Sequence, residues 1–154
     1  MADPYTFNIY NEKSLDEHKI WTIDRISSKL DFKNDKVIIC GDFNAHHNWW
    51  NSKINRPTRA ENLIKWIQSC KCTLININDE ITYIQKSHNG ATSVIDLTFA
   101  TRSVNDSVVN WKIDEEANSG SDHEVISFEL ITSTSNITNY ATTLANKYNL
   151  QKAD

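Results

Sequence analysis

Residues 36–47 read KVIICGDFNAHH, a short β-branched run that leads straight into a polar loop. A run of this length and composition is typical of a buried strand, which we expect over Lys36–Cys40. Asp42 and Asn44 then fall just past the carboxyl end of that strand, where α/β sheets commonly position reactive groups. Gly, Asp and Asn also favour turns. By itself the run therefore supports a reactive loop and a plain strand-ending turn about equally.

The flanking sequence extends this pattern in both directions. Alternating residues predict an early strand with Tyr5, Phe7 and Ile9 on its buried face, and capping boxes that begin at Ser14 and at Thr58 predict two helices. In chain order, the expected elements of the first half are a strand over Tyr5–Tyr10, a helix over Leu15–Leu30, the strand over Lys36–Cys40, a helix that the capping box Thr58–Glu61 opens and that runs to about Cys70, and a strand over Leu74–Ile77.

The second half changes to strand-type sequence. Turn signals at residues 88–90 and 118–120 separate β-rich stretches, which predicts a meander of strands. The expected strands span Ile81–Ile84, Ser93–Ala100, Ser107–Ile113 and Glu124–Leu130. Ser, Thr and Asn dominate from Thr132 onward, so residues 132–154 are expected to form a polar tail or linker with at most one weak helix near Tyr140–Tyr148.

Composition bounds the class of protein. The chain has 154 residues, 39% hydrophobic and 23% charged, which suits one soluble globular domain. Its net charge of −4 gives no general affinity for a nucleic-acid backbone, so any such binding must be local. No apolar run approaches a membrane span or a signal core. Cys40, Cys70 and Cys72 form neither a disulfide framework nor a zinc set. We therefore expect an intracellular location, cytoplasm or nucleus, and no membrane partner.

Two further polar features stand apart from the strand-end loop. Asp96 lies inside the apolar stretch SVIDLTF, residues 93–99, where a buried charge is costly without a partner. Asp122 and His123 follow a turn and precede a strand. Such a pair is, on its own, more often a cap beside a surface residue. His123 is nevertheless the natural partner for Asp96, and we expect the two side chains to meet.

These pieces, in this order, resemble the endonuclease/exonuclease/phosphatase superfamily, and most of all the apurinic-endonuclease-like domain of non-LTR retrotransposons. The motifs are GDFNAHH at 41–47 with Trp49 or Trp50 behind it, SVIDLTF at 93–99, Trp111, and SDH at 121–123. The resemblance covers Phe7 to Leu130. It implies an α/β fold, the later part of a four-layer sandwich in which helices flank two packed mixed β-sheets, over residues 5–131.

The resemblance also implies an activity, that of a Mg²⁺-dependent phosphodiesterase that hydrolyses the backbone of double-stranded DNA and leaves a 3′-hydroxyl. Mn²⁺ is a possible substitute. In this scheme Asp42 activates the attacking water and Asn44 helps to hold it. His123, aimed by Asp96, donates to a phosphate oxygen. Asp122 and Asp42 are the expected metal ligands, in keeping with the preference of Mg²⁺ for carboxylates.

Further residues are expected along the path of the DNA. Tyr10 falls where the family places a Tyr near the scissile phosphate, although the Pro that often follows is absent. The remaining expected nucleic-acid contacts are Asn89 and Ser93 at a hairpin, His46 and His47 in the loop that shapes the site, and Trp49 and Trp50 beside it. The two histidines also invite a zinc interpretation, which is weaker because adjacent histidines on an extended loop point apart.

One part of the family pattern has no counterpart here. The family's domain opens with strands that carry an Asn and a Glu, the Glu being the principal Mg²⁺ ligand, and nothing upstream of Tyr5 supplies them. We therefore expect missing opening strands and impaired turnover. Three alternatives stay open: an endonuclease whose N-terminal segment and reverse transcriptase belong to a parent polyprotein, an inactive remnant or nucleic-acid-binding fragment, and, least favoured, a small-substrate phosphatase.

Overall fold

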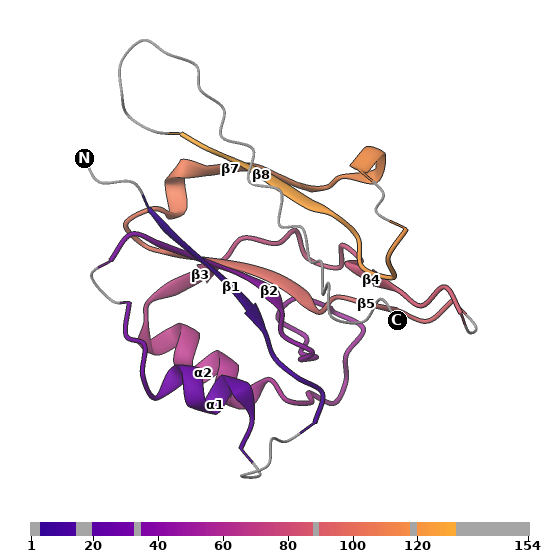
Figure 1. Ribbon diagram of the computed structural model, residues 1–154, viewed down its shortest axis with the longest axis horizontal. Coiled ribbons are helices and arrows are strands. Elements are labelled where there is room, and N and C mark those ends of the chain that lie inside the picture. Colours follow the sequence, from indigo (N-terminus) through magenta and orange to yellow (C-terminus); the bar gives the residue numbers. More distant parts are fainter. Residues whose placement is uncertain (1–3, 15–19, 33–34, 88–89, 118–119, 132–154) are drawn as a thin grey trace, which may run out of the picture.

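A central four-stranded sheet organises the computed structural model, which describes residues 4–14, 20–32, 35–87, 90–117 and 120–131. The two α-helices lie on one face of this sheet and the β7–β8 ribbon lies on the other (Figure 1). The described residues thus form a helix layer, a sheet and a second, smaller sheet. This arrangement confirms the expected α/β fold with packed sheets, of which the four-stranded one is mixed and the β7–β8 sheet is antiparallel.

The central sheet has the strand order β1-β2-β6-β3. Its members are β1 (Tyr5–Tyr10), β2 (Val37–Asp42), β6 (Asp96–Thr101) and β3 (Cys72–Leu74). β1 runs parallel to β2, whereas β6 is antiparallel to both of its neighbours. β6 therefore lies between two strands from much earlier in the chain. The predicted meander is wrong at this point, because periodicity marks a strand but not its partner.

Two hairpins complete the β structure. β4 (Tyr83–Ile84) pairs with β5 (Thr92–Ser93), and β7 (Val108–Ile113) pairs with β8 (Ile126–Leu130). Short 3₁₀ turns occur at Asn105–Ser107 and Glu115–Ala117. The single strand predicted over Ser93–Ala100 is two strands, since β5 belongs to the hairpin and β6 to the central sheet.

Both helices are shorter than their sequence patterns predict. α1 spans Thr22–Ser27, inside the expected Leu15–Leu30, of which residues 15–19 lie outside the described part of the chain. α2 spans Glu61–Ser69, and its N-cap is Ala60, without a side-chain cap. The predicted capping role of Thr58 is wrong: its backbone pairs instead with His46, at 2.9 Å in both directions.

The core is divided by the central sheet. The helices cover one face through buried residues that include Ile23, Leu63 and Trp66, and the β7–β8 ribbon covers the other through Trp111 and Phe128. A few expectations at the edges are wrong. β3 ends at Leu74, where a strand over Leu74–Ile77 was expected to begin, and Tyr5 is exposed because its end of β1 lacks a covering layer among the described residues.

Several expectations lie outside the described residues, namely those for the tail at 132–154, the helix at 140–148 and the turn residues 88–89 and 118–119. Gly90 and Gly120, the last residues of the two predicted turns, have φ of +63° and +74°. Neither described α-helix has the length and apolar character needed to cross a membrane.

Candidate active site

Three strands bring polar side chains into one row at one end of the central sheet. Tyr10 is paired with Asp42 across β1 and β2, and Asp42 is paired with Asp96 across β2 and β6. Directly paired residues project from the same face of a sheet, so the three side chains are neighbours. Both carboxylates are buried, and Tyr10 is 52% exposed. Asp42 is the last residue of β2, not the first beyond it.

His123 joins this row through Asp96. Its Nδ1 lies 2.8 Å from Oδ2 of Asp96, so the contact expected from the sequence is present. The Tyr83 ring packs edge-on against the imidazole, with 5.0 Å between the ring centroids. An ionised carboxylate can only accept a hydrogen bond, so Nδ1 carries the proton. The imidazole is thereby oriented, and Nε2 has no hydrogen-bond partner among the described residues.

Two buried side chains that the sequence patterns did not single out hold Asp96 in place. Thr82 Oγ1 accepts hydrogen bonds from the backbone N–H groups of Ile95 and Asp96, at 3.0 and 2.9 Å. Asn76 donates from Nδ2 to the carbonyl of Asp96 and accepts from the N–H of Thr98, at 3.0 and 2.7 Å. These contacts span a break in strand pairing, which no local motif reveals.

Asn44 is held in a strained conformation beside Asp42. Its φ is +46°, and its backbone N–H donates to Oδ1 of Asp42 at 2.9 Å. Its Nδ2 donates to the carbonyl of Asn11 at 2.8 Å, whereas its Oδ1 is buried without a hydrogen-bond partner. A buried acceptor without a donor is costly. Positive φ and an unpaired acceptor together mark a position shaped for something other than stability.

Asn11 is a second residue that the sequence patterns missed. It is 1% exposed, and its Nδ2 donates to the carbonyl of Phe43 at 2.7 Å while its Oδ1 accepts from the N–H of Ile23 at 3.1 Å. Its own N–H donates to the carbonyl of Asp42 at 2.8 Å. Asn11 therefore fastens the loop after β2 to β1 and α1. Its only sequence signal is its place directly after Tyr10.

One group of described side chains has the composition of a metal site. Ligand atoms of Asp42, Asp96 and His123 all lie within 4.8 Å of one another. Asp122, expected to be a metal ligand, is not in this group. Its Oδ1 accepts the backbone N–H of Lys86 at 3.2 Å, because the chain turns the carboxylate toward the β4–β5 hairpin. The cluster of possible ligands therefore includes Asp96, which the sequence patterns assigned to the orientation of His123, and does not include Asp122.

The aromatic residues of the loop after β2 differ in burial. Trp50 is 0% exposed and packs against the His47 ring, so the expected base contact is wrong for this residue and Trp50 is part of the core. Trp49 is 39% exposed, and its backbone N–H donates to Nδ1 of His47 at 3.0 Å. Ser93, in β5, is half-buried, and Asn89 lies outside the described residues. Only Trp49 remains a tryptophan that could meet a base at this loop.

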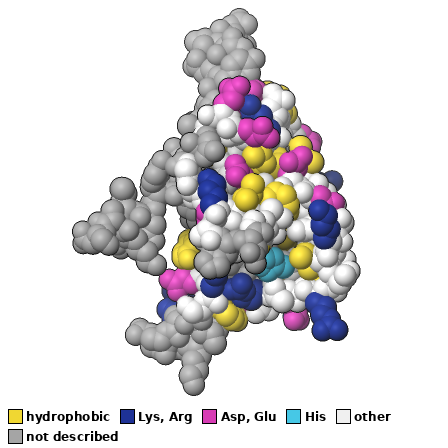
Figure 2. Space-filling model, turned by 90° about the vertical axis from the view of Figure 1, so that its right-hand side faces the viewer, with side chains coloured by type: hydrophobic (Ala, Val, Ile, Leu, Met, Phe, Trp, Pro, Cys, Tyr) yellow, Lys and Arg dark blue, Asp and Glu magenta, His cyan; other side chains and the backbone are white. Residues whose placement is uncertain are grey.

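His46 lies in a positive environment at the edge of the site. Burial lowers its pKa, and the charges of Arg59 and Lys13 lower it further, against an opposing effect of Asp42. His46 is therefore neutral near pH 7. Among the described residues, the cluster of possible metal ligands does not include His46 or His47. On the face shown in Figure 2, acidic side chains gather mainly in the upper part, whereas histidine reaches the surface lower down near basic side chains.

The chain belongs to the endonuclease-reverse transcriptase family, whose sequence model matches residues 5–127. Among solved structures it is similar to one described as the endonuclease domain of TRAS1, a telomere-specific non-LTR retrotransposon, with 28% identity and a TM-score of 0.59.

That similarity covers 73% of this chain and 50% of the other, so the chain spans about half the length of that structure. No protein with a curated description matches the sequence. The superfamily that the motifs resemble and the family-level hydrolase activity are confirmed.

Proposed function

We propose that this chain carries the catalytic row of a metal-dependent DNA endonuclease. The observation that supports the proposal best is the row itself. Tyr10, Asp42 and Asp96 lie side by side on three paired strands, and His123 is fixed to Asp96 at 2.8 Å. Such a set combines a candidate base, an oriented imidazole and an exposed phenol within one site, and these groups can activate a water and stabilise charge on a phosphate.

Each residue has a role that its contacts support. Asp42 would take a proton from the attacking water, and the unpaired Oδ1 of Asn44 would accept a second hydrogen bond from the same water. His123 would present Nε2–H to a non-bridging phosphate oxygen as negative charge develops there. Asp96 keeps the imidazole in that orientation. Tyr10, which is exposed, would contact the scissile phosphate from the side of β1.

Mg²⁺, with Mn²⁺ as a substitute, fits the donor set. Two buried carboxylates at paired positions repel each other without a cation, and hard cations prefer oxygen ligands. Asp42 would hold the ion with Asp96 close by, while imidazole is a poor Mg²⁺ ligand, which leaves His123 for the phosphate. When bound, the ion supplies charge stabilisation at the phosphate.

The substrate and the context follow from the family. We propose double-stranded DNA contacted through its backbone, and a reverse transcriptase in the same polyprotein, because the matching family is described as endonuclease-reverse transcriptase. With a net charge of −4, the DNA contacts must come from local groups such as Arg59 and Lys13. Three buried, unpaired cysteines suit the proposed intracellular location.

A second candidate function is DNA binding without turnover. The metal-ligand cluster of the described residues contains only two carboxylates, and one of them is engaged with His123. A site with so few oxygen ligands holds Mg²⁺ weakly. We therefore expect slow turnover from this chain alone.

Nicking of supercoiled plasmid tests the proposal. We expect slow nicking with Mg²⁺ or Mn²⁺ that stops with EDTA and disappears in Asp42→Ala and in His123→Ala. Retained binding of duplex DNA without nicking in either metal would favour the second candidate. Neither binding nor nicking would overturn both. Hydrolysis of p-nitrophenyl phosphate, without plasmid nicking, would instead support a small-substrate phosphatase.

A further inference from the structure

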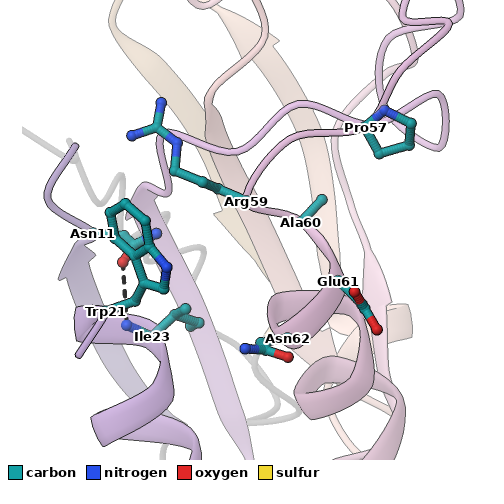
Figure 3. A pocket seen from close by; sticks show the side chains of 8 residues that line it. All are labelled: Asn11, Trp21, Ile23, Pro57, Arg59, Ala60, Glu61 and Asn62. Carbon is teal, nitrogen blue, oxygen red and sulfur yellow. Dashed lines mark hydrogen bonds between the residues drawn. The ribbon is translucent and has the colours of Figure 1, made fainter. Parts of the chain in front are cut away.

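A pocket opens between α1 and the start of α2, and Asn11 is the lining residue through which it adjoins the loop after β2. It has a volume of about 330 Å³, within the roughly 300–1,000 Å³ typical of small-ligand sites. Figure 3 shows Asn11, Trp21 and Ile23 on one side of it and Pro57, Ala60 and Glu61 on the other, with Arg59 above. Apolar and polar residues contribute about equally to its lining, and its one cationic group, Arg59, lies at the rim.

Asn11 lines this pocket and is also hydrogen-bonded to the loop after β2. Its side chain bridges the carbonyl of Phe43 and the N–H of Ile23, the latter drawn dashed in Figure 3. Its backbone N–H donates a hydrogen bond to the carbonyl of Asp42, and its carbonyl accepts one from the side chain of Asn44. One residue thus separates the pocket from the groups that would act on the scissile phosphate.

Arg59 is fixed over the pocket and keeps most of its donors. Its φ is +54°, its Nη1 donates to the carbonyl of Lys13 at 3.0 Å, and its guanidinium lies 5.9 Å from the centre of the Trp21 ring. A guanidinium has five N–H donors, and one is used among the described residues. Lys13, whose carbonyl Arg59 contacts, has its Nζ 5.5 Å from the centre of the Tyr83 ring, which packs against His123. A rigid, partly unsatisfied guanidinium suits a phosphate.

We propose that this pocket holds one nucleotide of the DNA strand next to the cleaved bond, with its base between Trp21 and the Pro57–Ala60 wall and its phosphate on Arg59. The inference rests on the proposed function, since it places the pocket along the substrate strand. Aromatic side chains stack on bases with little sequence preference. Glu61, the acidic residue of the lining, is paired with Lys65 at 2.6 Å and does not lie beside Arg59 in Figure 3.

Equilibrium binding in EDTA tests this inference independently of catalysis. The probes are a fluorescently labelled duplex with a single-stranded overhang and the dinucleotide pdTpdT. We expect Arg59→Ala to weaken binding of both about tenfold and to reduce the salt slope for the duplex by about one. Trp21→Leu should weaken pdTpdT binding about tenfold. Arg59→Lys should recover the salt slope but not the full affinity, because the forked donor is lost.

Lys112→Ala, an exposed charge removal on β7 in the other sheet, is the matched control and should leave pdTpdT affinity unchanged. Circular dichroism confirms that each variant is folded. Equal pdTpdT binding by wild type, Arg59→Ala and Trp21→Leu would overturn the inference. If these variants weaken binding while no preparation nicks plasmid, the pocket stands and the endonuclease proposal fails. If the protein nicks plasmid while Arg59→Ala and Trp21→Leu bind pdTpdT as tightly as the wild type, the endonuclease proposal stands and the pocket inference fails.

Discussion

Asp42 and Asp96 occupy directly opposing positions on the antiparallel strands β2 and β6. Both are buried, so each carboxylate raises the electrostatic cost of the other. His123 offsets part of this cost at Asp96, and the N–H of Asn44 offsets part of it at Asp42. Proteins keep such arrangements where function needs them, and the cation binding proposed for this pair would therefore stabilise the fold.

The first prediction follows from that link. Asp42→Asn keeps an oxygen for the N–H of Asn44 and removes one charge, so it should raise the free energy of unfolding in EDTA by about 0.5–1 kcal/mol. Millimolar Mg²⁺ or Mn²⁺ should raise the thermal midpoint of the wild type but not that of the variant. Thermal denaturation followed by circular dichroism measures both. An equal metal-induced shift in the two proteins would show that the ion binds elsewhere.

The second prediction concerns Gly41, the first residue of the GDFN loop. Its φ is +136°, and a Cβ atom there would lie 2.0 Å from the carbonyl oxygen of Ile9 on β1. That oxygen belongs to the backbone of a paired strand and cannot move aside cheaply. Gly41→Ala should therefore cost about 3 kcal/mol or more, from strain and overpacking together.

Urea denaturation measures that cost, and Gly120→Ala is the matched control. Gly120 also has a positive φ, of +74°, but nothing lies within 4 Å of its Cβ position. Its substitution should cost only the strain, about 1 kcal/mol. Similar losses in the two variants would mean that the contact with β1 is not what requires glycine at position 41.

The third prediction tests Thr82 as a positioning residue. Thr82→Val preserves shape but leaves two buried N–H groups without an acceptor, at Ile95 and Asp96, which should cost about 2–4 kcal/mol. A displaced Asp96 would also release His123, so nicking should fall beyond what partial unfolding explains. Thr73→Val, at an exposed position on β3, is the control. Thr82→Ser should restore nicking, because it restores the oxygen, and no recovery would argue against positioning by Oγ1.

The sequence predicted the local parts of this site and one long-range contact. Strand β2, the loop after it and the Asp96–His123 contact follow from apolar runs interrupted by charged residues, whose burial demands a partner. It could not predict Asn11, Asn76 or Thr82, because each is an ordinary polar residue in a connection. Their importance arises from which backbone groups the sheet order places against them.

The errors in the predicted helix cap and in the predicted exposure of Trp50 have the same origin. Thr58 has the spacing of a helix cap, but a backbone pairing with His46 takes it out of the helix. Trp50 lies next to the exposed Trp49 in sequence, and the two ring centroids are 6.4 Å apart, yet Trp50 is wholly buried because its ring packs inward with the core. Local propensity is overridden wherever a distant segment supplies a better partner.

The fourth prediction uses the buried thiols. Burial raises the pKa of Cys40 to about 11, and burial together with Cys70 raises that of Cys72 to about 12. Reactive thiolate is therefore scarce at pH 8, and Cys70 is buried as well. Native protein should react with Ellman's reagent far more slowly than protein in denaturant, where all three cysteines react. Rapid reaction of the native chain would contradict the burial of these three cysteines.

The fifth prediction concerns pH and His46. Its pKa is lowered in the folded chain by burial and by Arg59 and Lys13, so the unfolded chain takes up a proton first as the pH falls. Stability contributed by neutral His46 is therefore complete above its unfolded pKa of about 6.5 and is lost as the pH falls from there toward the folded value. His46→Gln should flatten the decline in urea midpoint between pH 7.5 and 5, whereas Asn48→Gln, two residues further along the same loop, should not. The same decline in His46→Gln and wild type would mean that His46 titrates alike in both states, and that Arg59 and Lys13 do not bring positive charge to this edge of the site.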